Sequence, residues 1–108
     1  MGVPVLLTDA AEGDLNELYN YIAQHDTLAK AGLVLTGIEQ AFSKLAETPE
    51  RGMVPAELSL LGIRSYREIF FKPYRIVYQV LPEAVVVLLI ADGRRDMQAL
   101  LLRRLLDG

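Results

Sequence analysis

The 108-residue chain is 52% hydrophobic and 23% charged, which fits one globular domain over residues 1–108 that buries roughly two thirds of its unfolded surface. It contains no cysteine, which excludes disulfides and thiolate metal sites, and no apolar run reaches the roughly 18 residues that span a bilayer. Because the N-terminus lacks the basic region of a signal peptide, we expect a soluble cytoplasmic protein without membrane contact.

Charge is divided unevenly between the two halves of the chain. Residues 1–57 hold nine acidic and three basic residues, a balance of −6, whereas residues 58–108 hold five acidic and eight basic residues, a balance of +3. Seven of these eight bases are arginine, which suits bidentate contacts with carboxylates or phosphates. The net charge of −3 argues against loose nucleic-acid binding, so any phosphate contact must be local. The alternative is that the divided charge is only a solvated surface.

The first half of the chain has the pattern of a short strand followed by two helices. Val3–Leu7 is β-prone, and Thr8 or Asp9 is placed to cap a helix that carries acidic residues in its first turns. Apolar residues recur at helical spacing on both sides of Thr27, which opens a second helix. We therefore expect an antiparallel helical hairpin over about residues 9–47. Three glycines either weaken it or allow close approach of the helices, and the sequence leaves both readings open: Gly13, Gly32 and Gly37.

The second half has the pattern of consecutive strands and a final helix. A loop is expected over Glu50–Gly62. Strands are then predicted over Ile63–Phe71, Tyr74–Val80 and Val85–Ile90. The last strand is apolar on both faces, so it belongs in the middle of a sheet that is covered on both sides. Asp96 is placed to cap a helix over Met97–Leu106. The order predicts an α+β domain, with an N-terminal strand and helical hairpin packed on an antiparallel sheet and a C-terminal helix.

Arginines gather around the last two strands. Arg75 lies within Tyr74–Val80, and Arg94 and Arg95 follow the final strand, so we expect the three to converge on a surface that meets an anion or an acidic partner. Tyrosines interleave with these arginines as in single-strand binders, but strand alternation places Tyr74 and Tyr78 opposite Arg75, which favours core packing.

Metal and cofactor sites are not expected. Four acidic residues near the N-terminus resemble a metal cluster in spacing, but helix capping and a solvated face explain them: Asp9, Glu12, Asp14 and Glu17. The single histidine, His25, falls in the turn of the helical hairpin. The chain has no Gly-rich phosphate loop and no nucleophile elbow.

Several motifs together resemble a known toxin superfamily. They are Asp14-Leu15, Tyr21-Ile22, Tyr66-Arg67-Glu68-Ile69, Pro73-Tyr74-Arg75-Ile76-Val77-Tyr78, and Gly93-Arg94-Arg95-Asp96 followed by leucine-rich sequence. In this order they resemble the RelE/ParE toxins of bacterial type II toxin–antitoxin (plasmid stabilisation) modules. The resemblance covers nearly the whole chain and implies the RelE/ParE-like fold.

One branch of that superfamily, the RelE-like branch, is made of ribosome-dependent mRNA endonucleases that work without a metal. RNA cleavage needs a base near the ribose 2′-OH, cations around the phosphate and an acid for the leaving oxygen. By resemblance, a ribonuclease would use Arg67, Glu68, Arg75 and Arg95. Neither tyrosine nor histidine follows Arg95 to transfer protons, and Glu68 is either a base or an ion-pair partner of its neighbouring arginines.

The ParE-like branch, which acts by poisoning DNA gyrase, needs a binding surface instead of catalytic residues. The long helical hairpin and the Gly-Arg-Arg-Asp ending look more like ParE, and target binding is then expected at Arg67, Arg75, Arg94 and Arg95. Many relatives have histidine immediately before the glycine, where this chain has Asp92, a carboxylate able to neutralise Arg94. A third alternative is a protein-interaction module without toxicity.

The resemblance also implies a cognate antitoxin and a hetero-oligomeric toxin–antitoxin complex. The final helix is apolar over most of its circumference, so its leucines either pack on the sheet or grip another chain, and the two are compatible. Antitoxin binding is expected at Met97, Leu100, Leu101 and Leu105. The other partner is DNA gyrase, or the ribosome and mRNA under the RelE-like alternative.

Overall fold

The computed structural model describes residues 2–107. In chain order the elements are β1 (Val5–Leu7), α1 (Asp9–His25), α2 (Leu28–Glu47), the 3₁₀ turn η1 (Pro49–Arg51), α3 (Ala56–Ser59), β2 (Arg67–Phe71), β3 (Tyr74–Val80), β4 (Val85–Asp92) and α4 (Met97–Asp107). None of the helices in this part of the chain has the length and apolarity required to cross a bilayer.

The strands form one four-stranded sheet in the order β1-β4-β3-β2. β2, β3 and β4 are an antiparallel meander, and β1 adds to the free side of β4 in parallel. The predicted α+β fold is confirmed, and the apolar strand β4 does lie inside the sheet. The N-terminal strand is itself part of the sheet, where it lies at the edge beside β4 and parallel to it.

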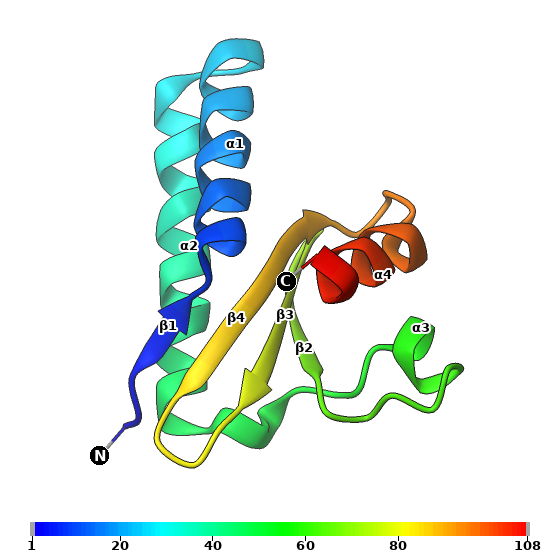
Figure 1. Cartoon of the computed structure of the whole chain (residues 1–108). Helices are drawn as coiled ribbons and strands as arrows, with labels where there is room; N and C mark the ends of the chain where they lie inside the picture. The colour runs from blue at the N-terminus through cyan, green and yellow to red at the C-terminus, as the bar shows by residue number, and fades with distance from the viewer. Residues whose placement is uncertain (1, 108) are drawn as a thin grey trace.

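The two long helices form the predicted hairpin, and each of them is preceded by a threonine whose side chain caps it. Thr8 accepts a hydrogen bond from the Ala11 amide at 3.1 Å, and Thr27 accepts one from the Lys30 amide at 3.0 Å. The hairpin lies along one face of the sheet and projects beyond the end of β4 (Figure 1). The outer part of the hairpin therefore stands clear of the sheet.

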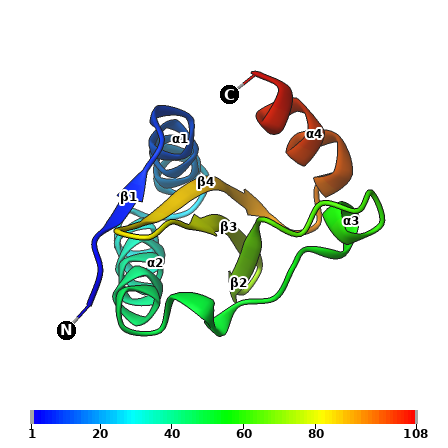
Figure 2. The same ribbon diagram turned by 60° about the horizontal axis from the view of Figure 1, so that its bottom comes forward.

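The sheet is covered on both faces, as Figure 2 shows, by the hairpin on one side and by α3 and α4 on the other. The core under the hairpin contains Ala11, Ile38, Leu45, Ile76, Tyr78, Val85, Val87 and Ile90. The core under α3 and α4 contains Leu58, Val77, Leu89, Ala91, Met97 and Leu101. Burial of these two sets is the main stabilising contribution to the fold.

A β-bulge in β4 divides its residues between the two cores. Tyr78 of β3 is opposite Val87, but the preceding residue Val77 is opposite Leu89, which leaves Leu88 as the extra residue. Val85 and Val87 face the hairpin before the bulge, whereas Leu89 faces α3 and α4 after it.

The structure decides between the two explanations of the helix glycines. A Cβ on Gly37 would overlap the ring of Phe71, so this glycine allows α2 to approach β2 closely. Gly13 and Gly32 have open space around them and serve no such contact. Of these three helix glycines, only Gly37 therefore has a packing role.

Several predicted bounds differ from the structure: β1 begins at Val5 and β4 ends at Asp92, each two residues later than predicted, and the start of β2 differs more. The strand expected from Ile63 begins at Arg67, because the Ile63 amide donates to the Leu58 carbonyl at 2.9 Å and so continues the turn that ends α3. The expected loop before it contains η1 and α3. Ile63 and Tyr66 pack against the core under α3 and α4 without belonging to a strand.

Candidate functional site

Arg75 occupies a cluster with two carboxylates on the α3 side of the sheet. Its guanidinium donates to both oxygens of Glu57 at 2.9 and 2.7 Å and, through Nε, to Glu68 at 2.7 Å. The side chains of Arg75 and Glu68 are only 12% and 8% exposed. The Phe70 ring lies over the guanidinium at 6.0 Å. We call these three charged residues the Arg75 cluster, and its net charge is −1.

Burial and pairing act in opposite directions on the two carboxyl groups. Hydrogen bonds from Arg75 lower the pKa of Glu57, whereas burial raises the pKa of Glu68 and outweighs the effect of the same arginine. The hydrogen bonds that Arg75 donates to Glu57 raise the pKa of Arg75, which stays protonated. Ion pairing is thus the geometry found for Glu68, one of the two alternatives that the sequence left open.

The expected convergence of Arg75 with Arg94 and Arg95 on one surface is wrong for Arg75. Residues directly opposite one another in an antiparallel sheet share a face, and Arg75 lies opposite Phe70 and Ala91 on the α3 and α4 side. Its stem passes under the loop that follows β4, where a Cβ on Gly93 would lie 2.9 Å from Arg75 Cδ. The positive charge of Arg75 is paired with Glu57 and Glu68 inside the protein.

Arg67 holds the segment that precedes α3. Its guanidinium donates to the carbonyls of Glu50 at 3.2 Å and Gly52 at 2.7 Å. The buried hydroxyl of Tyr78 accepts a hydrogen bond from the Gly52 amide at 3.0 Å on the same segment. Both side chains therefore fix the backbone around Gly52.

Arg94 and Arg95 lie on the surface after β4. Asp92 accepts hydrogen bonds from the Arg94 backbone amide, Nε and Nη2. These bonds lower the pKa of Asp92 to about 2, so the pair is ionised at neutral pH. Arg94 stays 79% exposed at its side chain despite this pairing. Of the four predicted arginines, Arg94 and Arg95 are thus the two that are exposed, whereas Arg67 and Arg75 are partly buried.

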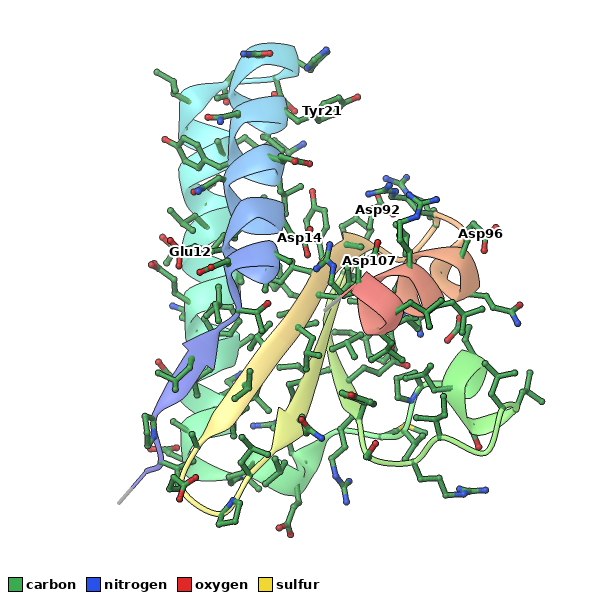
Figure 3. The ribbon with its side chains drawn as sticks, viewed as in Figure 1. Glu12, Asp14, Tyr21, Asp92, Asp96 and Asp107 are labelled. Atoms are coloured by element: carbon green, nitrogen blue, oxygen red, sulfur yellow. The ribbon has the colours of Figure 1, made fainter. Side chains whose placement is uncertain are left out.

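A cavity of about 510 Å³ opens beside these arginines, between α1 and the end of β4. Its apolar part comes from Leu18, Ile22, Tyr74, Ile90 and Ala91, and its polar part from Asp14, Glu17, Tyr21, Asp92, Arg94 and Arg95. Figure 3 shows Tyr21 projecting from α1 on the side where β4 ends at Asp92. Burial and the charge of Asp92 raise the pKa of Tyr74. We call this cavity the α1–β4 groove.

Asp14 joins three elements. Its carboxylate accepts a hydrogen bond from the Ile90 amide of β4 at 3.0 Å and two from Arg104 of α4 at 2.8 and 2.9 Å. Arg104 also donates to the Leu88 carbonyl at 2.6 Å. The expectation that Asp14 belongs to a solvated face is wrong, because its side chain is 15% exposed. Local spacing gives no signal for a pair that is 90 residues apart.

The apolar face of α4 already has an intramolecular partner. Met97 and Leu101 are buried in the core, and Leu100 and Leu105 pack against it, whereas Leu102 and Leu106 are exposed. Of the two compatible readings of these leucines, packing on the sheet is the one observed in the free chain.

Two observations on residues 2–107 concern metal binding and the single histidine. This part of the chain contains no cluster of three His, Asp or Glu side chains that could bind a metal. His25 stacks on Tyr21 at 4.2 Å between ring centroids, at the C-terminal end of α1.

Comparison with known proteins supports the same fold and identifies the family. The family model "ParE toxin of type II toxin-antitoxin system, parDE" matches residues 5–97. The chain belongs to the ParE toxin family. It is 30% identical to toxin ParE3 of Caulobacter vibrioides (strain ATCC 19089 / CIP 103742 / CB 15) over 95 residues, which cover 88% of this chain and 91% of that protein. It is therefore a ParE-family toxin of a type II toxin–antitoxin system.

Solved structures similar to this ParE-family toxin include members of both branches. A chain of the chromosomal ParDE system of P. aeruginosa has a TM-score of 0.69 at 18% identity, covering 83% of this chain and 95% of that one. A mutant of E. coli RelE in the free state has a TM-score of 0.63 at 15% identity, covering 92% of both chains. The RelBE2 toxin–antitoxin complex of Mycobacterium tuberculosis includes a chain with a TM-score of 0.58 at 23% identity, covering 85% of this chain and 99% of that one. These similarities show the shared fold.

The family match covers the toxin only up to the start of α4. The match includes the hairpin, the whole sheet and both exposed arginines, and it ends at the first residue of α4. In this ParE-family toxin, α4 supplies Arg104, the partner of Asp14.

Proposed function

We propose that this ParE-family toxin poisons DNA gyrase through the surface that carries Arg94 and Arg95. The observation that supports this most is the state of Glu68, the residue a nuclease would use as its base. It is buried, held by Arg75, and lies on the α3 and α4 side of the sheet, whereas Arg94 and Arg95 border the α1–β4 groove. Proton transfer needs a group within reach of the substrate, and a binding surface does not.

The exposed arginines suit recognition of an acidic or phosphate-bearing target. Arg95 and Arg94 stand at one end of a partly apolar groove, so a protein partner can combine apolar contact with charge-assisted hydrogen bonds there. Arg67 and Arg75 are already bonded inside the chain, Arg67 to the Gly52 carbonyl and Arg75 to Glu57.

Induced expression in bacteria tests the target. We expect arrest of DNA replication, induction of the SOS response and filamentation while bulk mRNA stays intact, and accumulation of gyrase-cleaved DNA with purified proteins. Rapid ribosome-dependent cleavage of transcripts, with gyrase supercoiling unaffected, would instead establish the RelE-like alternative. Absence of any growth effect would establish an interaction module without toxicity.

Arginine variants test the surface. Arg94→Ala/Arg95→Ala is expected to abolish toxicity at little cost in stability, because exposed substitutions usually change stability by less than about 0.5 kcal/mol. Arg64→Ala is the matched control, since Arg64 is exposed in the segment before β2 and away from the groove. Full toxicity of the double variant would show that this arginine pair is only solvated surface.

The cognate antitoxin is proposed to cover the same arginines with carboxylates. The α1–β4 groove offers apolar side chains from α1 and β4 to a segment that folds on binding. Titration calorimetry with the antitoxin should show that Leu18→Glu, on the groove wall, weakens binding, whereas Leu33→Glu, exposed on α2, leaves it unchanged. Equal effects of the two variants would place the antitoxin elsewhere.

A further inference from the structure

The outer edge of β4 is paired with a strand along only part of its length. β1 pairs with Val85–Val87, and its last backbone hydrogen bond joins the Thr8 amide to the Val87 carbonyl at 3.0 Å. The chain then turns into α1. The bulge at Leu88 follows at once, and beyond it the Leu88 carbonyl and the Ile90 amide point outward without a neighbouring strand.

Two side chains take the place of that strand. Arg104 donates to the Leu88 carbonyl, as a backbone amide would, and Asp14 accepts from the Ile90 amide, as a backbone carbonyl would. Two hydrogen bonds join the side chains of Arg104 and Asp14, which are 20% and 15% exposed, respectively. A donor and an acceptor at these positions are what an added strand brings to a sheet edge.

The space along this edge is open on both sides of the Asp14–Arg104 pair. The α1–β4 groove lies on one side, and a second cavity of about 210 Å³, bordered by Leu89, Leu100 and Arg103, lies on the other. Asp14, Glu17 and Arg95 border both cavities. The two cavities are neighbours along the end of β4, bordered by α1 on one side and α4 on the other, and we call the pair of them the edge channel.

The charges of the edge channel favour an acidic occupant. Asp92 pairs with Arg94, and Asp14 pairs with Arg104. The remaining charged groups on its borders are Arg95, Arg103 and Glu17, all exposed, with a net charge of +1. An extended segment with carboxylates on one side meets Arg95 and Arg103 while its backbone faces β4.

We propose that Asp14 and Arg104 occupy a strand-docking site on β4, and that its occupant is an extended acidic segment of the antitoxin. The side chains of Asp14 and Arg104 move away from β4 together, so the ion pair between them is kept. The backbone of the segment then forms hydrogen bonds with the Leu88 carbonyl and the Ile90 amide. Residues 88–92 of β4 match about five residues of such a segment, a length of about 16 Å. This inference rests on the proposed antitoxin partnership and adds the site and the conformation of the bound segment.

The first experiment uses the unaltered toxin. A candidate antitoxin is sought in the reading frames that flank the toxin gene and is co-expressed to show that it binds, and overlapping ten-residue peptides from it are titrated by fluorescence anisotropy. The tightest peptide is then resynthesised with alternate backbone nitrogens methylated in both phases. One phase is expected to lose at least tenfold in affinity and the other to lose less than threefold, because alternate amides of a strand face the sheet edge. Equal affinity of both phases would overturn strand addition.

The second experiment compares neighbouring arginines. The charge-balanced variant Asp14→Ala/Arg104→Ala removes the competing side chains and is expected to bind the peptide at least threefold more tightly. Arg103→Ala removes a cation from the channel border and is expected to bind at least threefold more weakly. Circular dichroism confirms folding of each variant, and the methylated peptides supply the test if the double variant fails to fold. Weaker or unchanged binding by a folded double variant would refute the competition.

Two further outcomes separate the explanations. If the intact antitoxin does not bind the unaltered toxin, the proposed antitoxin partnership itself fails. If it binds while no acidic peptide is sensitive to backbone methylation, only the strand-docking site fails. A concentration-dependent dimer of the folded double variant, seen by analytical ultracentrifugation without tighter antitoxin binding, would assign the edge to a second copy of the chain and overturn the proposal.

Discussion

Removing the charge of Glu57 or Glu68 should change stability in opposite ways, although both residues bond to the same arginine. Glu57→Gln weakens the two hydrogen bonds that Arg75 donates at 2.9 and 2.7 Å. Hydrogen bonds to charged groups contribute about 1.5–3 kcal/mol, and because the Glu57 side chain is 27% exposed we expect a loss of about 1–2 kcal/mol at pH 7. Glu68→Gln removes a carboxylate whose ionised form is disfavoured by burial, and leaves Arg75 paired one-to-one with Glu57. We expect this variant to be as stable as the parent or more stable.

The pH dependence follows from the two pKa directions. The pKa of Glu57 is lowered in the folded state, so its stabilisation is present above the unfolded value and is lost as pH falls through the folded pKa. The penalty of Glu57→Gln should therefore shrink below about pH 4. The pKa of Glu68 is raised, so its ionised form costs stability above the folded pKa, and the cost disappears as pH falls toward the unfolded value. The gain from Glu68→Gln should therefore appear at pH 7 and vanish in acid.

Urea unfolding followed by circular dichroism at pH 7 and at about pH 3 measures both effects. Glu50→Gln is the control, because the Glu50 side chain is exposed and only its backbone carbonyl contacts Arg67. A Glu68→Gln variant less stable than Glu57→Gln at pH 7 would show that ion pairing outweighs burial at Glu68, and our account of the Arg75 cluster would be wrong.

Three further predictions concern packing and hydrogen bonds. Gly37→Ala should destabilise the fold by about 1–3 kcal/mol in thermal unfolding because it displaces the Phe71 ring, whereas Gly32→Ala, with open space around it, should stabilise by up to about 1 kcal/mol. Tyr78→Phe leaves the buried Gly52 amide without its acceptor and should cost about 1–3 kcal/mol in urea unfolding, in contrast to the neutral control Tyr21→Phe at an exposed position. Truncation before Met97 uncovers Leu58, Val77 and Leu89 and removes one wall of the edge channel, so solubility and antitoxin affinity should fall together; unchanged affinity in titration calorimetry would place the interface elsewhere.

Local patterns in the sequence predicted most of the fold. The caps at Thr8 and Thr27 and the helical spacing of apolar residues predicted the hairpin, and the continuous apolar run of β4 predicted a central strand. The start of β2 was predicted too early, because Ile63 and Tyr66 are apolar for packing against the α3 and α4 core and not for strand pairing.

The arrangement of charged residues was harder to predict because it depends on contacts between distant segments. The Arg75 cluster joins Arg75 to Glu57, 18 residues away, and Asp14 meets Arg104 from 90 residues away. The pairing of Asp92 with Arg94 was predicted from the sequence because the two are neighbours on the chain. The roles of Arg94, Arg95 and the α4 leucines in toxicity and antitoxin binding stay predictions for the experiments above.

The bulge at Leu88 also explains why the β4 sequence lacks the alternation of a typical strand. Without the extra residue, strict alternation would place Val85, Val87, Leu89 and Ala91 on the hairpin side and Asp92 on the side of α3 and α4. With it, Asp92 emerges on the hairpin side, opposite Tyr74 and next to the α1–β4 groove. One residue in the middle of an apolar strand thereby determines on which side of the molecule the carboxylate partner of Arg94 is displayed. An insertion or deletion within β4 would thus change which side chains the strand displays next to the α1–β4 groove, although none of the residues that now border the groove is replaced.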